Sequence, residues 1–248
     1  MIVTGHQPAY LPWLGLIHKA SLADVFIYMD DVQYLEQDWN NRNKIKTSAG
    51  VAKWLSVPVD LKTSSSRVLK DIVISPEEDK SESKRWYSIH WATLQASYGK
   101  APFFKDYKDF FESLYMGQRW THLSALNLAL LRQIFIWFSI SAKIEIASEL
   151  NFTKSKSDLV LEHAKKFNAK AVVTGIMGKD YIQTEDFKNQ GVYVEFQDYQ
   201  HPKYEQRFGE FVSHLAFVDL LFQHGPQARE ICLGGNLTRE QLCHRISN

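Results

Sequence analysis

The first thirty residues alternate between two kinds of hydrophobic pattern, and this alternation limits what the chain can fold into. Residues 2–4 form a short apolar run typical of a strand, residues 13–20 have helical spacing, and residues 24–29 form a second apolar run. A strand, a helix and a strand within so few residues predict a βαβ unit, in which the two strands pair in parallel through a right-handed crossover.

The same pattern returns in the second half of the chain, after a middle region that is helical. We expect an α/β fold with a Rossmann-like, mostly parallel sheet, and we interpret residues 1–248 as a single domain with a helical insertion at about residues 81–140. The predicted strands are residues 54–59, 68–74, 144–147, 171–174 and 192–196, the predicted helices are residues 81–98, 103–115, 121–139, 156–167 and 211–223, and residues 32–50 are predicted to form a polar connection.

The charge balance and the two cysteines exclude several classes of protein. Lys and Arg number 29 against 28 Asp and Glu, so no overall positive field favours nucleic acid. The most apolar window, residues 123–140, is interrupted by Asn127 and Arg132, which predicts a buried helix and no membrane insertion. Cys232 and Cys243 lack metal-site spacing and fit a reducing cytoplasm.

Residues 5–15 carry the most chemistry of any connection in the chain. This turn follows the first predicted strand, where ligands bind in open α/β sheets, and it contains His6, Gln7, Tyr10 and Trp13. We expect His6 to lie at the sheet edge as a candidate base. The alternative is that the two prolines stiffen a turn while Tyr10 and Trp13 cap the core.

A basic, amide-rich stretch follows the second predicted strand. Asn41, Arg42, Lys44 and Lys46 could hold a phosphate or carboxylate, with Trp39 beside them as a stacking surface. The alternative is a solvated basic loop.

The acidic pair Asp30-Asp31 precedes this basic stretch. It resembles the pair that holds a divalent metal in glycosyltransferases, although Asp30 could equally cap a helix or partner Arg42. We assign no metal site, and Asp31 remains a candidate substrate contact.

Two later segments add further candidates. Gly175, Lys179 and Tyr181 follow a predicted strand, and their turn could bind a diphosphate, although the spacing is not that of a Walker loop. His201, Tyr204 and Gln206 repeat the His-Pro-Tyr-Gln chemistry of the N-terminal turn, so His201 is a second candidate base, with a surface histidine as the alternative. Asp219, on a leucine-rich helix face, is expected to be either buried and satisfied or an orienter of a group that contacts the ligand.

Several motifs occur in order along nearly the whole chain and carry a resemblance to a known family. They are His6-Gln7-Pro8 with Tyr10-Leu11-Pro12-Trp13 and Gly15, Ala23-Asp24-Val25-Phe26 with Asp30-Asp31-Val32-Gln33, Asn41-Arg42-Asn43 with Ile45-Lys46, Trp54-Leu55 with Val57-Pro58-Val59, Thr174-Gly175 to Tyr181, and His201-Pro202 with Tyr204 and Gln206. On these motifs the chain resembles the WbqC-like proteins. The resemblance implies a cytoplasmic enzyme, found in gene clusters for bacterial O-antigen and related surface polysaccharides, that acts on a nucleotide-linked sugar. It supplies no catalytic residue.

The leading hypothesis is an acyl or aminoacyl transferase that modifies an amino sugar carried on a nucleotide diphosphate. Under it the basic residues Arg42, Lys44, Lys46 and Lys179 hold the diphosphate, the aromatic residues Tyr10, Trp13 and Trp39 stack on base or sugar, and His6 or His201 takes the proton from the attacking amine. The rivals are a nucleotidyl transferase, a metal-dependent glycosyltransferase that uses Asp30-Asp31, and a non-catalytic protein of the same pathway. The sequence identifies no cofactor and leaves the oligomeric state open.

Overall fold

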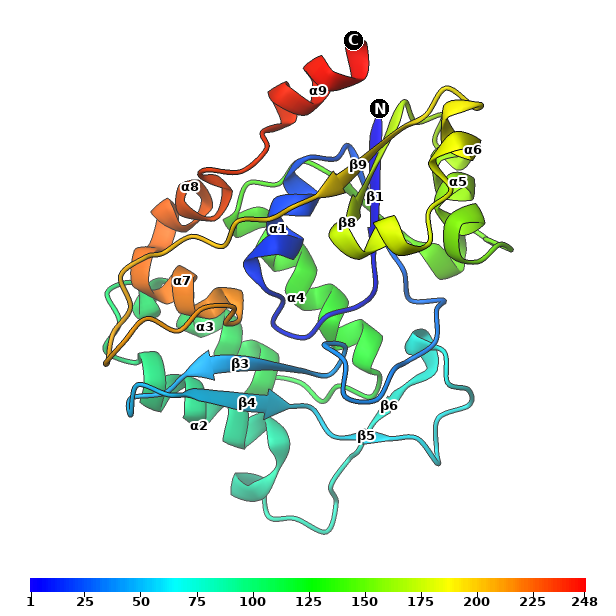
Figure 1. Cartoon of the computed structure of the whole chain (residues 1–248). Coiled ribbons are helices and arrows are strands. Elements are labelled where there is room, and N and C mark those ends of the chain that lie inside the picture. The colour runs from blue at the N-terminus through cyan, green and yellow to red at the C-terminus, as the bar shows by residue number, and fades with distance from the viewer.

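The main sheet has five strands, and every neighbouring pair in it is parallel. Its strands β1, β8 and β9 lie side by side in Figure 1. A computed structural model describes residues 1–248. The strand order is β7-β2-β1-β8-β9, which confirms the predicted Rossmann-like α/β class. The strands are β1 (Ile2–His6), β2 (Val25–Tyr28), β7 (Lys143–Ile146), β8 (Ala171–Gly175) and β9 (Tyr193–Gln197).

Helices cover both faces of the sheet because its central strands are apolar on both sides. One face packs against α5 (Lys156–Lys166) and α6 (Thr184–Lys188), with Ala164 and Phe187 among the buried contacts. The other face packs against α1 (Leu14–Ser21), α4 (Leu123–Trp137) and α9 (Arg239–Ser247). No helix is both long enough and apolar enough to cross a membrane.

A second and larger hydrophobic cluster of 34 buried residues lies on the α1 side, away from the sheet. Because α1 contributes Leu14 and Ile17 to this cluster and Leu16 and Ala20 to the sheet side, it joins the two cores. The remaining elements are α2 (Trp86–Tyr98), α3 (Phe104–Met116), α7 (Phe217–His224), α8 (Ala228–Leu233) and four short strands, β3 (Arg42–Lys46), β4 (Ala52–Ser56), β5 (Val59–Asp60) and β6 (Val73–Ile74).

The structure corrects the predicted connection at residues 32–50. It contains β3, which pairs antiparallel with β4, a strand that the prediction began only at Trp54. Asn43 and Ile45 point inward and alternate with Arg42 and Lys44, which point outward. Because the inward residue Asn43 is polar, the sequence lacks the alternation of apolar and polar residues that identifies a strand.

Three other predicted boundaries are also corrected. Pro58 has no N–H to donate, and the strand predicted at residues 54–59 is divided into β4 and β5 on either side of it. Residues 68–74 hold a 3₁₀ turn, Leu69–Asp71, and only the short β6. The helix predicted at residues 211–223 begins at Phe217, because His214 has a positive φ of 56° and Ala216 pairs with Trp13 instead.

Candidate functional site

One of the two neighbours of strand β1 separates from it before its carboxyl end. Its pairing with β8 stops at Thr4↔Val173, whereas it pairs with β2 as far as His6↔Tyr28. Strand β8 pairs onward with β9 to Gly175↔Gln197. The chain order of the sheet reverses between β1 and β8, and ligands of open α/β sheets bind in the crevice beyond such a point.

His6 ends β1 at this crevice as a neutral imidazole. Its Nδ1 lies 2.8 Å from the Gln7 carbonyl oxygen, which can only accept, so Nδ1 carries the proton and Nε2 is left as an acceptor. Burial, followed by the positive charge of Lys19, lowers the pKa of His6 to about 3, against a raising effect of the Gln7 hydrogen bond.

A continuous row of rings begins at His6, and we call His6, Trp13, Trp39 and Trp54 the aromatic row. Successive ring centres are 5.2, 5.9 and 5.4 Å apart. Trp39 and Trp54 are 37% and 41% exposed, so the far end of the row is open to solvent. These four residues come from the end of β1, the β1–α1 turn, the connection before β3, and β4.

Two cations lie over the exposed end of the aromatic row. The guanidinium carbon of Arg42 is 4.6 Å from the centre of the Trp54 ring and the Lys44 ammonium is 4.8 Å from it. Both project outward from β3, where Lys44 is opposite Trp54 of β4 and Arg42 is opposite Ser56, two residues further along β4. The Nε of Arg42 is buried without a partner, although its Nη2 donates to the Gln37 carbonyl. This arrangement offers a stacking face with positive charge beside it.

Other predicted anion-binding and site residues are instead drawn into a buried network around Asp219. This fully buried carboxylate accepts from the Tyr98 hydroxyl at 2.9 Å, the Tyr204 hydroxyl at 3.0 Å and the Gln206 amide at 2.8 Å. The ammonium of Lys46 donates to Gln206 Oε1 and to a backbone carbonyl. Asp219 is buried and satisfied, which is one of the two predicted outcomes, and the network gives Lys46, Tyr204 and Gln206 partners inside the protein.

Three further candidates from the N-terminal half also have internal partners. The hydroxyl of fully buried Tyr10 bonds His90 at 2.8 Å, which assigns Tyr10 to the core. The Asn41 amide donates to the Val57 carbonyl at 2.8 Å. Gln7 Oε1 accepts from Asn40 at 3.4 Å.

The two aspartates after β2 differ in their hydrogen bonding. Asp30 accepts from the Ser148 backbone at 2.9 Å and from its hydroxyl at 2.8 Å. Asp31 Oδ1 is buried without a partner, and burial raises the pKa of that carboxyl. No group of three or more His, Cys, Asp or Glu side chains is arranged to hold a metal ion.

His201 lies in a segment that the fold fastens beside the aromatic row. The Ala216 amide of this segment donates to the Lys44 carbonyl at 2.8 Å, and Ala216 bridges to Trp13. The His201 ring lies 4.8 Å from that of His214. Both of its nitrogens are engaged, since Nδ1 bonds the Pro202 carbonyl and Nε2 accepts from the His214 amide.

The turn after β8 is the most exposed of the predicted segments. Lys179 lies 5.9 Å from the centre of the Phe196 ring, and Tyr181 is 40% exposed. A Cβ on Gly178 would come within 2.6 Å of Thr174, so this position requires glycine. A Cβ on Gly175 would meet no atom within 4 Å, so the end of β8 is open.

A residue that the sequence reasoning missed lies at the same crevice. Lys19, 5% exposed, donates from Nζ to the Gly5 carbonyl at 3.0 Å. Burial lowers the pKa of Lys19 to about 7. The signal available in the sequence was the position of Lys19 within an apolar helical run. The structure buries every residue from Leu14 to Ala20.

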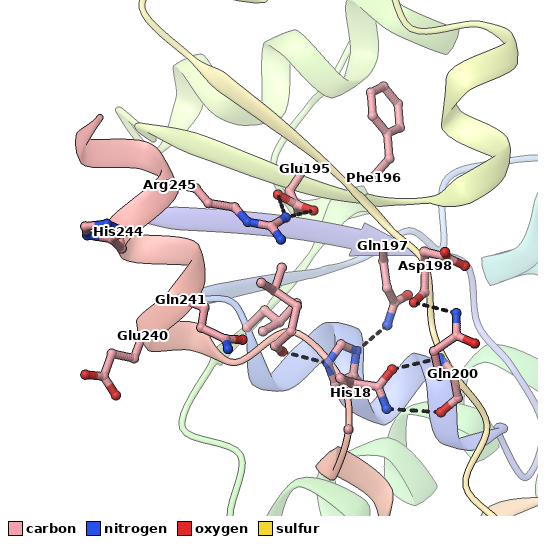
Figure 2. A pocket seen from close by; sticks show the side chains of 14 residues that line it. His18, Glu195, Phe196, Gln197, Asp198, Gln200, Glu240, Gln241, His244 and Arg245 are labelled. Carbon is pink, nitrogen blue, oxygen red and sulfur yellow. Dashed lines mark hydrogen bonds and ion pairs between the residues drawn. The ribbon is translucent and has the colours of Figure 1, made fainter.

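A separate cavity of about 870 Å³ lies along the outer edge of β9, between α1 and α9 (Figure 2). His18 spans part of it, bonding the Gln197 amide at 2.6 Å and the Leu237 carbonyl at 2.9 Å, and Arg245 pairs with Glu195 at 2.9 Å. None of the predicted site residues lines this cavity.

Comparisons with known proteins identify one family. The model of the WbqC-like protein family matches residues 7–231. The chain is 30% identical over 223 residues to a protein of Mycobacterium tuberculosis (strain ATCC 25618 / H37Rv), "Uncharacterized protein Rv1507c". The matched residues cover 90% of this chain and 93% of that protein. No solved structure matches the chain.

Proposed function

This chain belongs to the WbqC-like protein family, and from that membership we propose that it is a transferase acting on a nucleotide-linked sugar in surface polysaccharide synthesis. The reaction we favour is transfer of an acyl or aminoacyl group to an amino sugar. The sugar is bound through its nucleotide diphosphate.

The single observation that carries this proposal is the aromatic row with its two cations. A nucleotide diphosphate needs a flat apolar surface for its base and positive charge for its phosphates, and Trp39, Trp54, Arg42 and Lys44 supply both within one exposed patch. The row runs to His6 at the end of β1, so a ligand stacked on the tryptophans extends toward the crevice of the sheet.

In the proposed reaction His6 contacts the attacking amine of the sugar. Nε2 accepts a hydrogen bond from that amine and so directs the nitrogen lone pair toward the acyl carbon. As the N–C bond forms, the bond between the acyl carbon and its departing group breaks, and the amine proton moves to Nε2 and from there to the departing group. Backbone N–H groups in the His6 or the Gly175 turn would stabilise the negative charge on the acyl oxygen.

The structure bears on the rivals unequally. Hydrogen bonds from Ser148 occupy both oxygens of Asp30, which weighs against a glycosyltransferase that holds its metal with Asp30-Asp31. A nucleotidyl transferase would use the same nucleotide surface. It is distinguished by release of pyrophosphate from a nucleoside triphosphate in the presence of Mg²⁺.

The direct test is calorimetry with a panel of dTDP-, UDP- and GDP-sugars. We expect at least one to bind, and we expect Arg42→Gln to weaken that binding about tenfold or more, since a hydrogen-bonded charge pair contributes about 1.5–3 kcal/mol. Arg132→Gln, at an exposed position of α4, is the matched control and should bind as the wild type does. No binding of any sugar nucleotide to the wild type would overturn the proposal.

A further inference from the structure

Lys19 is a buried amine with a single hydrogen-bond acceptor and no opposite charge beside it. Its side chain leaves α1 and its Nζ meets a single acceptor, the Gly5 carbonyl oxygen at 3.0 Å. No carboxylate pairs with it. An ammonium ion has three donors, so two are left unused in a residue that is 5% exposed. Burying an unpaired charge is costly, and a group in this position either loses its proton or awaits a counter-ion.

The place where this amine lies is the fork between β1 and β8. The two strands stop pairing at Thr4↔Val173, one residue before the carbonyl that Lys19 bonds. Beyond the fork the chain at Gly175 has free space on its side-chain position. The fork therefore combines an open strand end, a switch in strand order and an amine with unused donors.

We propose that the fork between β1 and β8 is a phosphate subsite, and that Lys19 binds the phosphate as an ammonium ion that forms when the ligand arrives. The proposal rests on the proposed function in one respect, that the phosphate belongs to a nucleotide diphosphate. The subsite itself requires only a phosphate or diphosphate group.

The charge change follows from the balance between burial and pairing. Burial alone lowers the pKa of Lys19 to about 7, so above neutral pH the free protein holds a neutral amine there. A phosphate dianion supplies the missing opposite charge and raises this pKa again. The amine then takes one proton from the buffer, and no other atom changes its bonding.

The groups around Lys19 do not titrate in the same range. His6 on β1 has a pKa lowered to about 3, and His163 of α5, on the far side of Gly5, has a pKa lowered to about 4. Burial also lowers the pKa of His18 on α1. Pyrophosphate itself titrates in this range, so the proton uptake that reports on Lys19 is the difference between the wild type and a variant with a permanent charge at this position.

The test is calorimetry at pH 8 with inorganic pyrophosphate, in buffers with different ionisation enthalpies. Lys19→Arg keeps a permanent charge, so its proton balance on binding is that of pyrophosphate alone. The wild type should take up close to one proton more than Lys19→Arg does. Lys19→Met should weaken binding about tenfold or more and lack this excess uptake. Lys108→Met, on the surface of α3, is the control and should behave as the wild type does.

A second measurement keeps the test independent of how the variants fold. In the wild type, the carbon chemical shift of Lys19 Cε follows its protonation, and pyrophosphate should move its titration midpoint upward by one pH unit or more. An unchanged midpoint, binding without the excess uptake, or the full excess uptake in a folded Lys19→Met protein would each overturn the subsite.

The two proposals can fail separately. If sugar nucleotides bind equally to the wild type and to Lys19→Met with no excess proton uptake, the phosphate subsite is wrong while the proposed function stands. If pyrophosphate binds with the excess uptake but no sugar nucleotide binds, the subsite stands and the proposed function is wrong.

Discussion

The imidazole of His6 meets the indole of Trp13 edge to face, with ring centres 5.2 Å apart. This contact connects the end of the central strand to an aromatic surface that otherwise belongs to the β3–β4 hairpin and the connection before it. Trp13 also bridges to Ala216, so three distant parts of the chain meet at one indole. The geometry of the proposed site depends on this meeting point.

Trp54→Ala is expected to lower the affinity for the bound sugar nucleotide about tenfold, because base–aromatic stacking contributes about 1–3 kcal/mol. The change removes the ring beneath Arg42 and Lys44 and leaves their charges in place. Calorimetry measures the affinity, and quenching of tryptophan fluorescence by the ligand provides a second readout. Ile89→Ala, at an exposed position on α2, is the control. Equal affinities for wild type and Trp54→Ala would remove stacking from the proposal.

His6→Gln is expected to lower the rate of group transfer by roughly 10²–10⁴-fold, with a smaller effect on KM, since the lost group acts on the attacking amine. The measurement is single-turnover transfer to the sugar nucleotide found by calorimetry. His201→Gln should cost less, because both ring nitrogens of His201 already have partners within its own segment. A larger loss at His201 than at His6 would reverse this assignment.

His163→Leu is expected to flatten the dependence of stability on pH. Burial lowers the pKa of His163 from 6.5 to about 4, so the unfolded chain binds a proton before the folded protein does. The contribution of neutral His163 to the free energy of unfolding is therefore fully present above pH 6.5. It falls by about 1.4 kcal/mol per pH unit between pH 6.5 and 4.

Urea denaturation at pH 7, 6 and 5 measures this slope. The slope for the wild type should be the sum of the slopes from its buried histidines. These include His90, whose pKa burial lowers to about 3. The His163→Leu protein should show a slope smaller by one proton. An identical slope in the two proteins would mean that His163 is protonated to the same extent in the folded and unfolded states.

Asp219→Ala is expected to lower the free energy of unfolding by about 3 kcal/mol, because it leaves the Tyr98 and Tyr204 hydroxyls and the Gln206 amide buried without an acceptor. Urea denaturation at pH 7 measures the change. Asp109→Ala, with its side chain 87% exposed, is the control and should lie within about 0.5 kcal/mol of the wild type. A change of that small size at Asp219 would contradict the structural role of the network.

The parallel sheet could be predicted because its strands are apolar on both faces and separated by helical spacing. Residues 24–29 and 192–196 were predicted as strands on that pattern, and β2 and β9 lie there. Strand β3 could not be predicted in this way, because Asn43 points inward and is satisfied by the Leu11 carbonyl, a partner 32 residues away.

The candidate site was predictable only in its chemistry. His6, Trp13, Trp39, Arg42 and Lys44 were singled out by residue type, and the structure brings them into one row with Trp54. Lys46 has the same charge and lies two residues from Lys44, yet it is 2% exposed. Residue type could not separate the two, because what covers Lys46 is a segment more than 150 residues further along the chain.

By itself the sequence determined the α/β class, the strands of the parallel sheet and the chemical types available at their ends, because hydrophobic periodicity and turn residues act locally. Only the tertiary structure decided which of those groups are free to meet a ligand. The parting of β1 from β8 around the Gly5 carbonyl, the unpaired amine of Lys19 and the enclosure of Lys46 by the Asp219 network all arise from contacts between distant segments. Burial and pairing determine whether a side chain is charged and accessible to a ligand, and the adjacent residues in the sequence do not specify either one.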